Sequence, residues 1–356
     1  MWTFHKLQPY SSKSCRVGWL THENNVLFKW RFDQLTSFGR MRSGNIGEWV
    51  NAYDDGFHNE VYCPSRRYDI VVFQKVMGER WQSEVLRIQA YGGKVIFDAN
   101  VNYYDIWGDY VVPGTQPTEE QQRDAIWMTR HADWVVADSS YIAGITRKFN
   151  LHVTWIPDNV NLEVYKGVKE HQPKERIRLV WSGVGKKAQH LLLIRDVLAC
   201  LKNIELVLVV DDKPKIVRDL EYVVPCRIVQ FSDQSYAKTL LDCDVIISPK
   251  MLVNGYEMGH TEYKITLGMA VGLPAVASPQ QSYIEAISHN NGGVVANTND
   301  DWFRALTQLV DDHQLRSEMG ARARQTVLER YSTPVIARQY LRVFQLLTDR
   351  GDESET

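Results

Sequence analysis

Short, continuous apolar segments alternate with longer helix-like segments along almost the entire chain. The apolar segments occupy residues 16–20, 68–73, 94–98, 134–138 and 153–157, and after a gap 177–182, 204–210, 227–230, 244–248, 274–278 and 293–296. A strand that is buried on both faces of a parallel sheet needs such a continuous run, because neither face meets water. Segments such as 79–91, 119–131, 187–202 and 300–312 lie between the runs and have the character of helices. The repetition of strand, helix and strand predicts an α/β fold with doubly wound parallel sheets.

A polar and charged stretch at residues 164–174 interrupts the alternation. Because it shows no hydrophobic periodicity, it indicates a linker between domains. We therefore expect two Rossmann-like α/β domains, residues 1–165 and 175–332, on either side of a cleft. Residues 333–349 are expected to form a last helix, whose apolar positions, including Tyr340 and Phe344, fall on one side.

Composition argues against several classes of protein. The chain has 356 residues, 41 Lys and Arg, 43 Asp and Glu and a formal net charge of −2, so it lacks the basic excess that nucleic acid binding requires. No stretch approaches the roughly 18 apolar residues of a membrane span, and the N-terminal residues contain no unbroken apolar segment typical of a signal peptide. The five cysteines are scattered without a C-x-x-C pair, which argues against a disulfide framework or a zinc knuckle. We therefore expect a protein of the reducing cytoplasm.

The loop after the strand at 177–182 combines small residues with lysines, in the order Ser-Gly-Val-Gly-Lys-Lys. In open α/β sheets, ligands bind beyond the carboxyl ends of the strands. Gly183 and Gly185 allow backbone N–H groups to approach an anion, the following helix N-terminus favours negative charge, and Lys187 or Lys186 adds a cation. The loop therefore predicts a phosphate site, although an ordinary glycine turn with solvated lysines has the same composition.

A long loop at residues 249–263 follows the strand at 244–248. Thr261 is expected to cap the next helix, whose free N–H groups would again face an anion. Carboxylates such as Glu262 beside a phosphate are suited to binding ribose or sugar hydroxyls. A solvated surface loop with capping residues explains the same pattern equally well.

Two polar positions in the first half also follow predicted strands. Asp98 ends the strand at 94–98 and His22 follows the strand at 16–20. Each is a candidate catalytic or acceptor-orienting residue on the other side of the cleft, or a structural residue at a turn. The amphipathic segment 25–38 is predicted to be a helix packed on the first sheet. Contact with a membrane surface or an amphiphilic acceptor is the alternative.

Five stretches resemble glycosyltransferases of the GT-B fold, family-4 type. Residues 155–163 (WIPDNVNLE) resemble the segment that ends the first domain of that family, and 182–187 are similar to its donor loop. Residues 264–278 (KITLGMAVGLPAVAS) resemble its "K-EAMA-G-PVVAS" segment, and 283–296 and 314–332 resemble the segments that follow. The five stretches occur in the family's order. They cover the second half well, whereas the first half agrees only in strand order.

The resemblance implies a GT-B architecture, with an acceptor domain, a donor domain and a last helix that returns to the first domain. It implies transfer of a sugar from a nucleotide-diphosphate sugar, as donor substrate, to an acceptor hydroxyl, with retention, with no bound metal and with no cofactor. The acceptor would be a glycan, a lipid-linked or a small molecule of cell-envelope or other polysaccharide synthesis. With such an acceptor, the protein would act in the cytoplasm or at the inner face of the membrane.

The resemblance also assigns donor residues, with two departures from the family pattern. The family arginine falls on Val184, which leaves Lys187 as the cation for the diphosphate. The family's pair of glutamates falls on Gly259 and Leu267 in one alignment and on Asn254 and Glu262 in another. Glu262 and Lys264 are the expected surviving donor contacts.

Two other functions stay open, the first of them because the glutamate pair is altered. One is a non-catalytic subunit that binds a sugar nucleotide or glycan. The other is a sugar-nucleotide epimerase with the same two-domain architecture, which would act on the donor without an acceptor.

Overall fold

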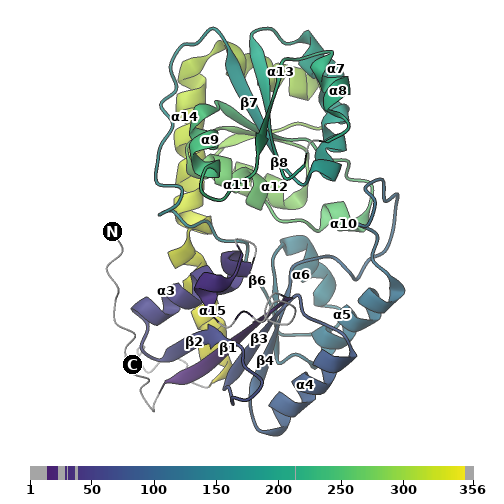
Figure 1. Ribbon diagram of the computed structural model, residues 1–356, viewed down its shortest axis with the longest axis vertical. Coiled ribbons are helices and arrows are strands. Elements are labelled where there is room, and N and C mark those ends of the chain that lie inside the picture. Colours follow the sequence, from purple (N-terminus) through teal and green to yellow (C-terminus); the bar gives the residue numbers. More distant parts are fainter. Residues whose placement is uncertain (1–13, 23–28, 30, 37–38, 213, 349–356) are drawn as a thin grey trace.

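The computed structural model describes residues 14–22, 29, 31–36, 39–212 and 214–348. Within these residues the chain forms two α/β domains that lie end to end along the long axis of the molecule (Figure 1). Each domain contains one six-stranded sheet in which all paired strands are parallel. The predicted α/β architecture of two Rossmann-like domains is therefore confirmed.

The sheet of the first domain has the strand order β2-β1-β3-β4-β5-β6. Its strands are β1 Cys15–Thr21, β2 Phe57–Val61, β3 Ile70–Gln74, β4 Lys94–Ala99, β5 Trp134–Ala137 and β6 Val153–Trp155. The helical segments are the 3-10 turn η1 Phe32–Gln34, the π-helical turn η2 Arg40–Gly44, α3 Asn45–Tyr53, α4 Glu79–Ala90, α5 Glu119–His131 and α6 Ser140–Thr146. The strand β2 was not among the predicted ones, because its sequence, FHNEV, alternates instead of running continuously apolar. This alternation fits its position at the edge of the sheet.

The sheet of the second domain has the order β12-β11-β10-β7-β8-β9. Its strands are β7 Ile177–Gly183, β8 Ile204–Val210, β9 Cys226–Gln230, β10 Val245–Ser248, β11 Ala275–Ala277 and β12 Gly293–Val295. The helices are α7 Arg195–Cys200, α8 Val217–Glu221, α9 Tyr236–Asp242, α10 Gly255–Met258, α11 Tyr263–Ala270, α12 Gln281–Ser288, α13 Asn299–Asp311 and α14 His313–Thr326, followed by the π-helical turn η4 Val327–Tyr331.

The predicted helix at 187–202 is wrong in its type and its start. The segment begins at Gly185 as the 3-10 helix η3 Gly185–Ile194 and becomes α-helical only in α7. The N-cap residue of η3 is Val184, and no side chain caps its first turn. The tighter 3-10 coil still leaves Lys187 within the first turn after β7.

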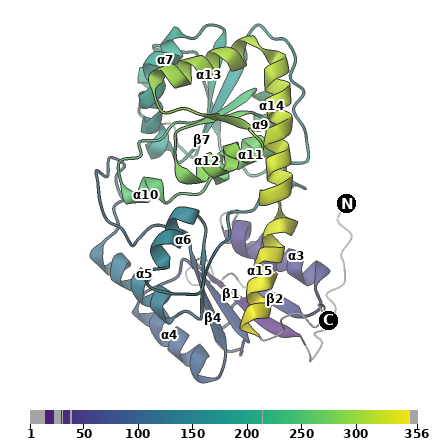
Figure 2. The same ribbon diagram turned by 180° about the vertical axis from the view of Figure 1, so that it is seen from behind.

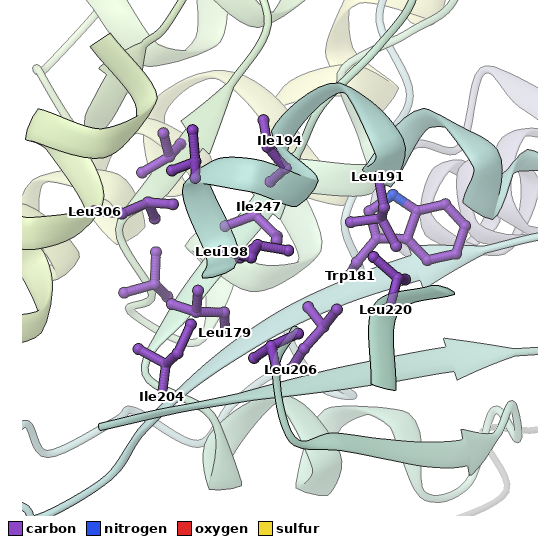
Figure 3. Packing of buried hydrophobic residues seen from close by; sticks show 14 of the residues in the cluster. Leu179, Trp181, Leu191, Ile194, Leu198, Ile204, Leu206, Leu220, Ile247 and Leu306 are labelled. Carbon is purple, nitrogen blue, oxygen red and sulfur yellow. The ribbon is translucent and has the colours of Figure 1, made fainter. Parts of the chain in front are cut away.

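The core of the second domain lies on both faces of its sheet, because successive strand residues point to opposite sides. Leu179, Trp181 and Ile247 pack under η3, α7 and α13 in one cluster, with Leu198 and Leu306 among their neighbours (Figure 3). The alternate strand residues, such as Val180 and Ile246, belong to a second cluster with α11 and α12.

The final helix, α15 Thr333–Leu347, packs on the first domain. It runs on from α14 and η4 of the second domain and lies along the other sheet (Figure 2). Tyr340 and Phe344 are fully buried in the same cluster as Val17 and Trp19 of β1.

Residues 25–28, 30, 37 and 38 of the predicted segment 25–38 lie outside the described residues. Its described residues 31–36 contain the 3-10 turn η1 and no α-helix, but Phe32 and Leu35 are buried in the same cluster as β1, as predicted for a segment packed on the first sheet. Among the helices that the structure describes, none is both long and apolar enough to cross a membrane.

Candidate functional site

The carboxyl ends of the two sheets face a cavity of about 910 Å³ between the domains. The first domain contributes residues at the ends of β3, β4 and β5, namely Gln74, Lys75, Asn100 and Asp138, together with Arg42 of η2. The second domain contributes the loop after β7 and the segment around α10 and α11, namely Ser182, Gly183, Lys187, Tyr256, His260, Thr261 and Lys264. This is the position at which open α/β sheets bind ligands.

The loop after β7 supplies the predicted Gly183, Gly185 and Lys187. Gly183 lines the cavity, and a Cβ atom there would lie 3.0 Å from the Lys264 Nζ. Gly185 is required because a Cβ atom would lie 2.6 Å from the Asp212 carbonyl oxygen. Its N–H donates to the Asp211 Oδ1 at 2.7 Å. This N–H group is therefore occupied, and the predicted cradle of free backbone donors is not present at Gly185.

The adjacent lysines Lys186 and Lys187 point to different places. Lys187 lines the cavity, whereas the exposed Lys186 donates to the Pro113 carbonyl oxygen of the first domain at 3.1 Å. The Lys187 Nζ donates to His260 Nε2 at 2.9 Å and lies 4.7 Å from the centre of the Tyr256 ring. His260 in turn donates from Nδ1 to the Tyr256 carbonyl oxygen at 2.6 Å, and because its Nε2 accepts from Lys187 at the same time, the imidazole is neutral. Burial lowers the pKa of Lys187 and of His260.

Two more lysines lie close to Lys187. The Lys264 Nζ sits 4.7 Å from the centre of the Trp181 ring, and burial together with the Lys187 charge lowers its pKa to about 8. Lys250 is the second residue after β10 and is almost fully buried. Burial lowers its pKa to about 7, in spite of the opposing charge of Glu257.

Among the residues that the structure describes, Glu257 is the carboxylate whose charge acts on all three lysines, Lys187, Lys250 and Lys264. Its oxygens lie 3.5 Å from the Lys250 Nζ and 3.6 Å from the His190 Nε2. Burial alone would raise the pKa of Glu257, but His190 and the neighbouring cations hold it well below its ordinary value. Three lysines against one carboxylate leave this wall of the cavity positively charged, and a buried excess of positive charge favours an anionic ligand.

Thr261 and Glu262 occupy different environments. Thr261 lines the cavity and donates from Oγ1 to the Asp158 Oδ2 at 2.8 Å. The residue at the N-cap of α11 is Glu262 and not the predicted Thr261. Glu262 is fully buried, is not among the cavity-lining residues, and both of its carboxylate oxygens lack a hydrogen bond. Burial raises its pKa well above the ordinary value.

The structure places neither Asp98 nor His22 on the cavity wall. Asp98 is fully buried and receives two hydrogen bonds from Arg42, at 3.0 Å each, and one from the Tyr340 hydroxyl at 3.0 Å. Asp98 therefore holds Arg42 and ties α15 to the first domain. His22 is exposed, immediately after β1.

Arg42 connects the two domains through Asp158. Its Nη1 donates to the Asp158 Oδ1 at 2.8 Å, and the second oxygen of Asp158 accepts from Thr261 of the second domain. Sequence reasoning missed Arg42, because it lies on a short π-helical turn with no motif around it. It also missed Lys250, although its position after β10 was a usable signal.

Comparison with known proteins relates the second domain to one family. A family described as glycosyl transferase-like matches residues 232–342. This match includes α11, β11 and α14, which carry several of the stretches on which the resemblance rests. No curated protein matches the sequence significantly.

Solved structures match nearly the whole chain at low sequence identity. A glycosyltransferase from Rickettsia africae has a TM-score of 0.63 and 14% identity, with 95% of this chain and 100% of that chain covered. Anabaena HepE in complex with UDP-glucose has a TM-score of 0.62 and 13% identity, with 93% and 100% covered. Sucrose-phosphate synthase from Thermosynechococcus elongatus has a TM-score of 0.61 and 15% identity, with 80% and 75% covered. The predicted resemblance to the GT-B fold of glycosyltransferases is confirmed.

Proposed function

We propose that this protein transfers a glycosyl unit from a nucleotide-diphosphate sugar to an acceptor hydroxyl. The observation that carries the proposal is the cluster of Lys187, Lys250 and Lys264 at the carboxyl end of the second sheet. The family match over residues 232–342 and the fold of the whole chain support the same reaction class.

In this reaction the bond between the anomeric carbon and the diphosphate oxygen breaks, and its electron pair leaves with the diphosphate. The acceptor oxygen bonds to the anomeric carbon, and the proton of its hydroxyl passes to the departing diphosphate. Lys187 lies at the cavity surface and is placed to neutralise the charge that develops on the diphosphate. Lys264 lies beside it, and the buried Lys250 adds positive potential from behind. Such preorganised charge in a site removed from water stabilises the transition state.

Retention at the anomeric carbon and independence of divalent metal ions belong to this proposal through the resemblance alone. Among the described residues, no group of histidine, cysteine and acidic side chains is arranged to hold a metal ion. The acceptor and the cellular location are likewise proposed from the resemblance: a glycan, lipid-linked or small-molecule acceptor, met in the cytoplasm or at the inner face of the membrane.

The test is turnover with a panel of nucleotide sugars and sugar acceptors, followed by mass spectrometry of the products. Transfer should yield an acceptor heavier by one sugar, in the presence of EDTA as well as of Mg²⁺. A product formed only with divalent metal would contradict the metal-independent mechanism. A new sugar nucleotide formed without any acceptor would indicate epimerisation instead. Tight nucleotide binding with no product from any acceptor would indicate a binding subunit.

A further inference from the structure

The chain crosses between the two domains twice, and the two crossings lie side by side. The first crossing follows β6, and the second leads from η4 into α15 (Figure 2). The Val160 N–H donates to the Tyr331 carbonyl oxygen at 2.6 Å, and the Thr333 N–H donates to the Val160 carbonyl oxygen at 3.2 Å. The second crossing begins in the π-helical turn η4, a departure from α-helical geometry that often occurs at functional sites. We therefore expect the domains to move about this pair of crossings, which we call the hinge (residues 156–160 and 331–333).

Glu262 lies where the second domain meets both the hinge and the first domain. It is the N-cap residue of α11, and α11 packs in one buried cluster with Val160 and Tyr331 of the hinge. Directly beside it, the Thr261 Oγ1 donates to the Asp158 Oδ2 of the first domain at 2.8 Å. Glu262 is therefore placed at the contact between the domains and not on an outer face of either one.

Two further contacts join the domains around Glu262. The Ser140 Oγ of α6 donates to the Glu285 Oε1 of α12 at 2.6 Å. The Arg330 Cζ of η4 lies 5.6 Å from the centre of the ring of Trp155, the last residue of β6. The charges of Glu285 and Arg330 both act on Glu262. A movement of the domains about the hinge therefore changes the surroundings of the Glu262 carboxyl group.

The Glu262 carboxyl group is buried without a partner in this arrangement of the domains. Its residue is fully buried, and both of its oxygens lack a hydrogen bond. An ionised carboxylate in such a place would lose its hydration without compensation, so the group takes up a proton instead. Burial raises the pKa of Glu262 well above its ordinary value, and the charges of Asp158 and Glu285 raise it further, although Arg330 acts in the opposite direction. In this arrangement Glu262 is therefore neutral.

The ionisable groups around Glu262 come from each element packed against it, and carboxylates prevail among them. Arg42 offers little compensation, because Asp98 and Asp158 already share its hydrogen bonds. An ionised Glu262 would therefore also be repelled by its neighbours. These neighbours are Asp138 after β5, Asp158 after β6, Tyr283 and Glu285 of α12, and Arg330 and Tyr331 of η4.

We propose that Glu262 is a proton-operated switch beside the hinge: it is neutral and buried while the domains lie together, and it ionises when they separate and water reaches it. Separation then releases one proton from the Glu262 carboxyl group to the solvent, and closure takes one up. The switch does not depend on the proposed function, because it concerns the arrangement of the domains and not the reaction.

The direction of the pH dependence follows from the two states of Glu262. In the separated state the carboxyl group is in water and has the ordinary pKa of a glutamate, about 4.3, whereas burial raises its pKa in the closed state. Below about pH 4.3 the group is protonated in both states, so pH does not change their balance. At higher pH the ratio of separated to closed molecules should rise by up to about tenfold per pH unit, until the pH reaches the raised pKa of the closed state.

The experiment is small-angle X-ray scattering on the full chain without ligand, from about pH 5 to pH 8, which lies above the ordinary pKa of a glutamate. We expect the radius of gyration to increase with pH as the separated population grows. Glu262→Gln and Glu262→Leu cannot ionise, so each should keep a small radius over the whole range, and either one decides the matter if the other fails to fold. Glu262→Asp keeps an ionisable carboxyl group and should retain the increase. Infrared spectroscopy near neutral pH should show a protonated carboxyl band that is weaker in Glu262→Gln than in the unchanged protein.

The matched control is Glu318→Gln, which removes an exposed carboxylate from α14. It should expand with pH like the unchanged protein. The proposal is overturned if the radius of the unchanged protein is constant over the range, or if Glu262→Gln and Glu262→Leu expand as the unchanged protein does. A protonated carboxyl band of equal strength in Glu262→Gln would overturn it as well, because Glu262 would then be ionised in the closed state.

Discussion

At the scale of single residues, the cavity is distinguished by lysines whose charged form is destabilised by burial. Taking a lysine ammonium group out of water is unfavourable unless an opposite charge compensates it. Lys250 has such a partner in Glu257, whereas Lys187 donates to a neutral imidazole and Lys264 lies over an indole ring. A bound diphosphate would compensate the positive charges of both Lys187 and Lys264. Binding energy is thus available at these lysines for an anion and not for a neutral ligand.

The first prediction concerns Lys187. A charge-assisted contact to phosphate contributes about 1.5–3 kcal/mol, so Lys187→Ala should weaken UDP binding roughly ten- to a hundredfold. The matched variant is Lys186→Ala, whose side chain is exposed and reaches Pro113 instead of the cavity. It should change the affinity by no more than about 0.5 kcal/mol. Isothermal titration with UDP measures both. Equal affinity of the two variants would remove this loop from the donor site.

The second prediction concerns pH. The pKa of Lys250 is lowered to about 7 and that of Lys264 to about 8, so both are protonated below these values and lose their charge as the pH rises. A bound diphosphate favours the charged lysines and raises their pKa again, so binding takes up protons in this window. UDP-glucose affinity should therefore fall between about pH 7 and pH 9.

Titration of UDP-glucose in two buffers of different ionisation enthalpy measures this proton uptake directly. Lys264→Met should remove the part of the decrease that is centred near the higher pKa. Affinity that is constant across the window, with no proton uptake, would mean that these lysines do not face the diphosphate.

At the scale of elements, a loop of the first domain joins the two domains beside the cavity. This crossing loop, residues 101–115, follows β4 and reaches α10. The Asn102 Nδ2 donates to the Gly255 carbonyl oxygen at 2.9 Å, and the Asp109 N–H donates to the Val253 carbonyl oxygen at 3.0 Å. Gly108 lies at the contact with φ of 82°, and a Cβ atom there would lie 1.9 Å from the Val253 carbonyl oxygen.

The third prediction is that Gly108→Ala detaches the crossing loop from the second domain. The added methyl group collides with backbone and the backbone conformation disfavours alanine, so the loss of stability should exceed about 1 kcal/mol. Small-angle scattering should show a larger radius of gyration as the domains separate. The control is Gly144→Ala in α6, where a Cβ atom meets nothing within 4 Å. That variant should be up to about 1 kcal/mol more stable. An unchanged scattering curve for Gly108→Ala would show that the loop does not hold the domains together.

The elements also show what a sequence can and cannot predict here. The continuous apolar runs identify the buried strands, because burial on both faces is a local requirement on residue type. The edge strand β2 escapes this test, since half of its side chains face outward. Gly183 and Lys187 are found from the sequence because one short loop carries the signal. The pairing of Arg42 with Asp98 joins positions 56 residues apart, and that of Asp158 with Thr261 joins positions 103 apart. Such contacts depend on the tertiary fold. The sequence therefore leaves open whether Asp98 is catalytic or structural, whereas in the structure Asp98 is buried behind the cavity wall and holds Arg42.

At the scale of the whole molecule, the core of the first domain contains residues from both the first described strand, β1, and the last described helix, α15. Phe344 of α15 lies with its ring centre 6.3 Å from Trp19 of β1 and 5.6 Å from Phe57 of β2. Tyr340 reaches Arg42 and Asp98 from the same helix. Because α15 continues from the second domain, the first domain acquires its full core only when the rest of the chain is in place. The stability of the first domain therefore depends on a helix that follows the second domain in the sequence.

The last prediction tests this dependence with Phe344→Ala. Deletion of a fully buried aromatic ring leaves a cavity and costs about 3–5 kcal/mol, and the loss should fall on the first domain although residue 344 is close to the end of the chain. Hydrogen exchange should accelerate in β1 and β2, whereas β7, β8 and β10 of the second domain should keep their protection, because their cores contain no residue of α15. Leu346→Ala removes a side chain from the same helix that is 58% exposed, and it should cost no more than about 0.5 kcal/mol and leave exchange unchanged. Faster exchange in β7 and β8 for Phe344→Ala would mean that the two domains unfold as one unit.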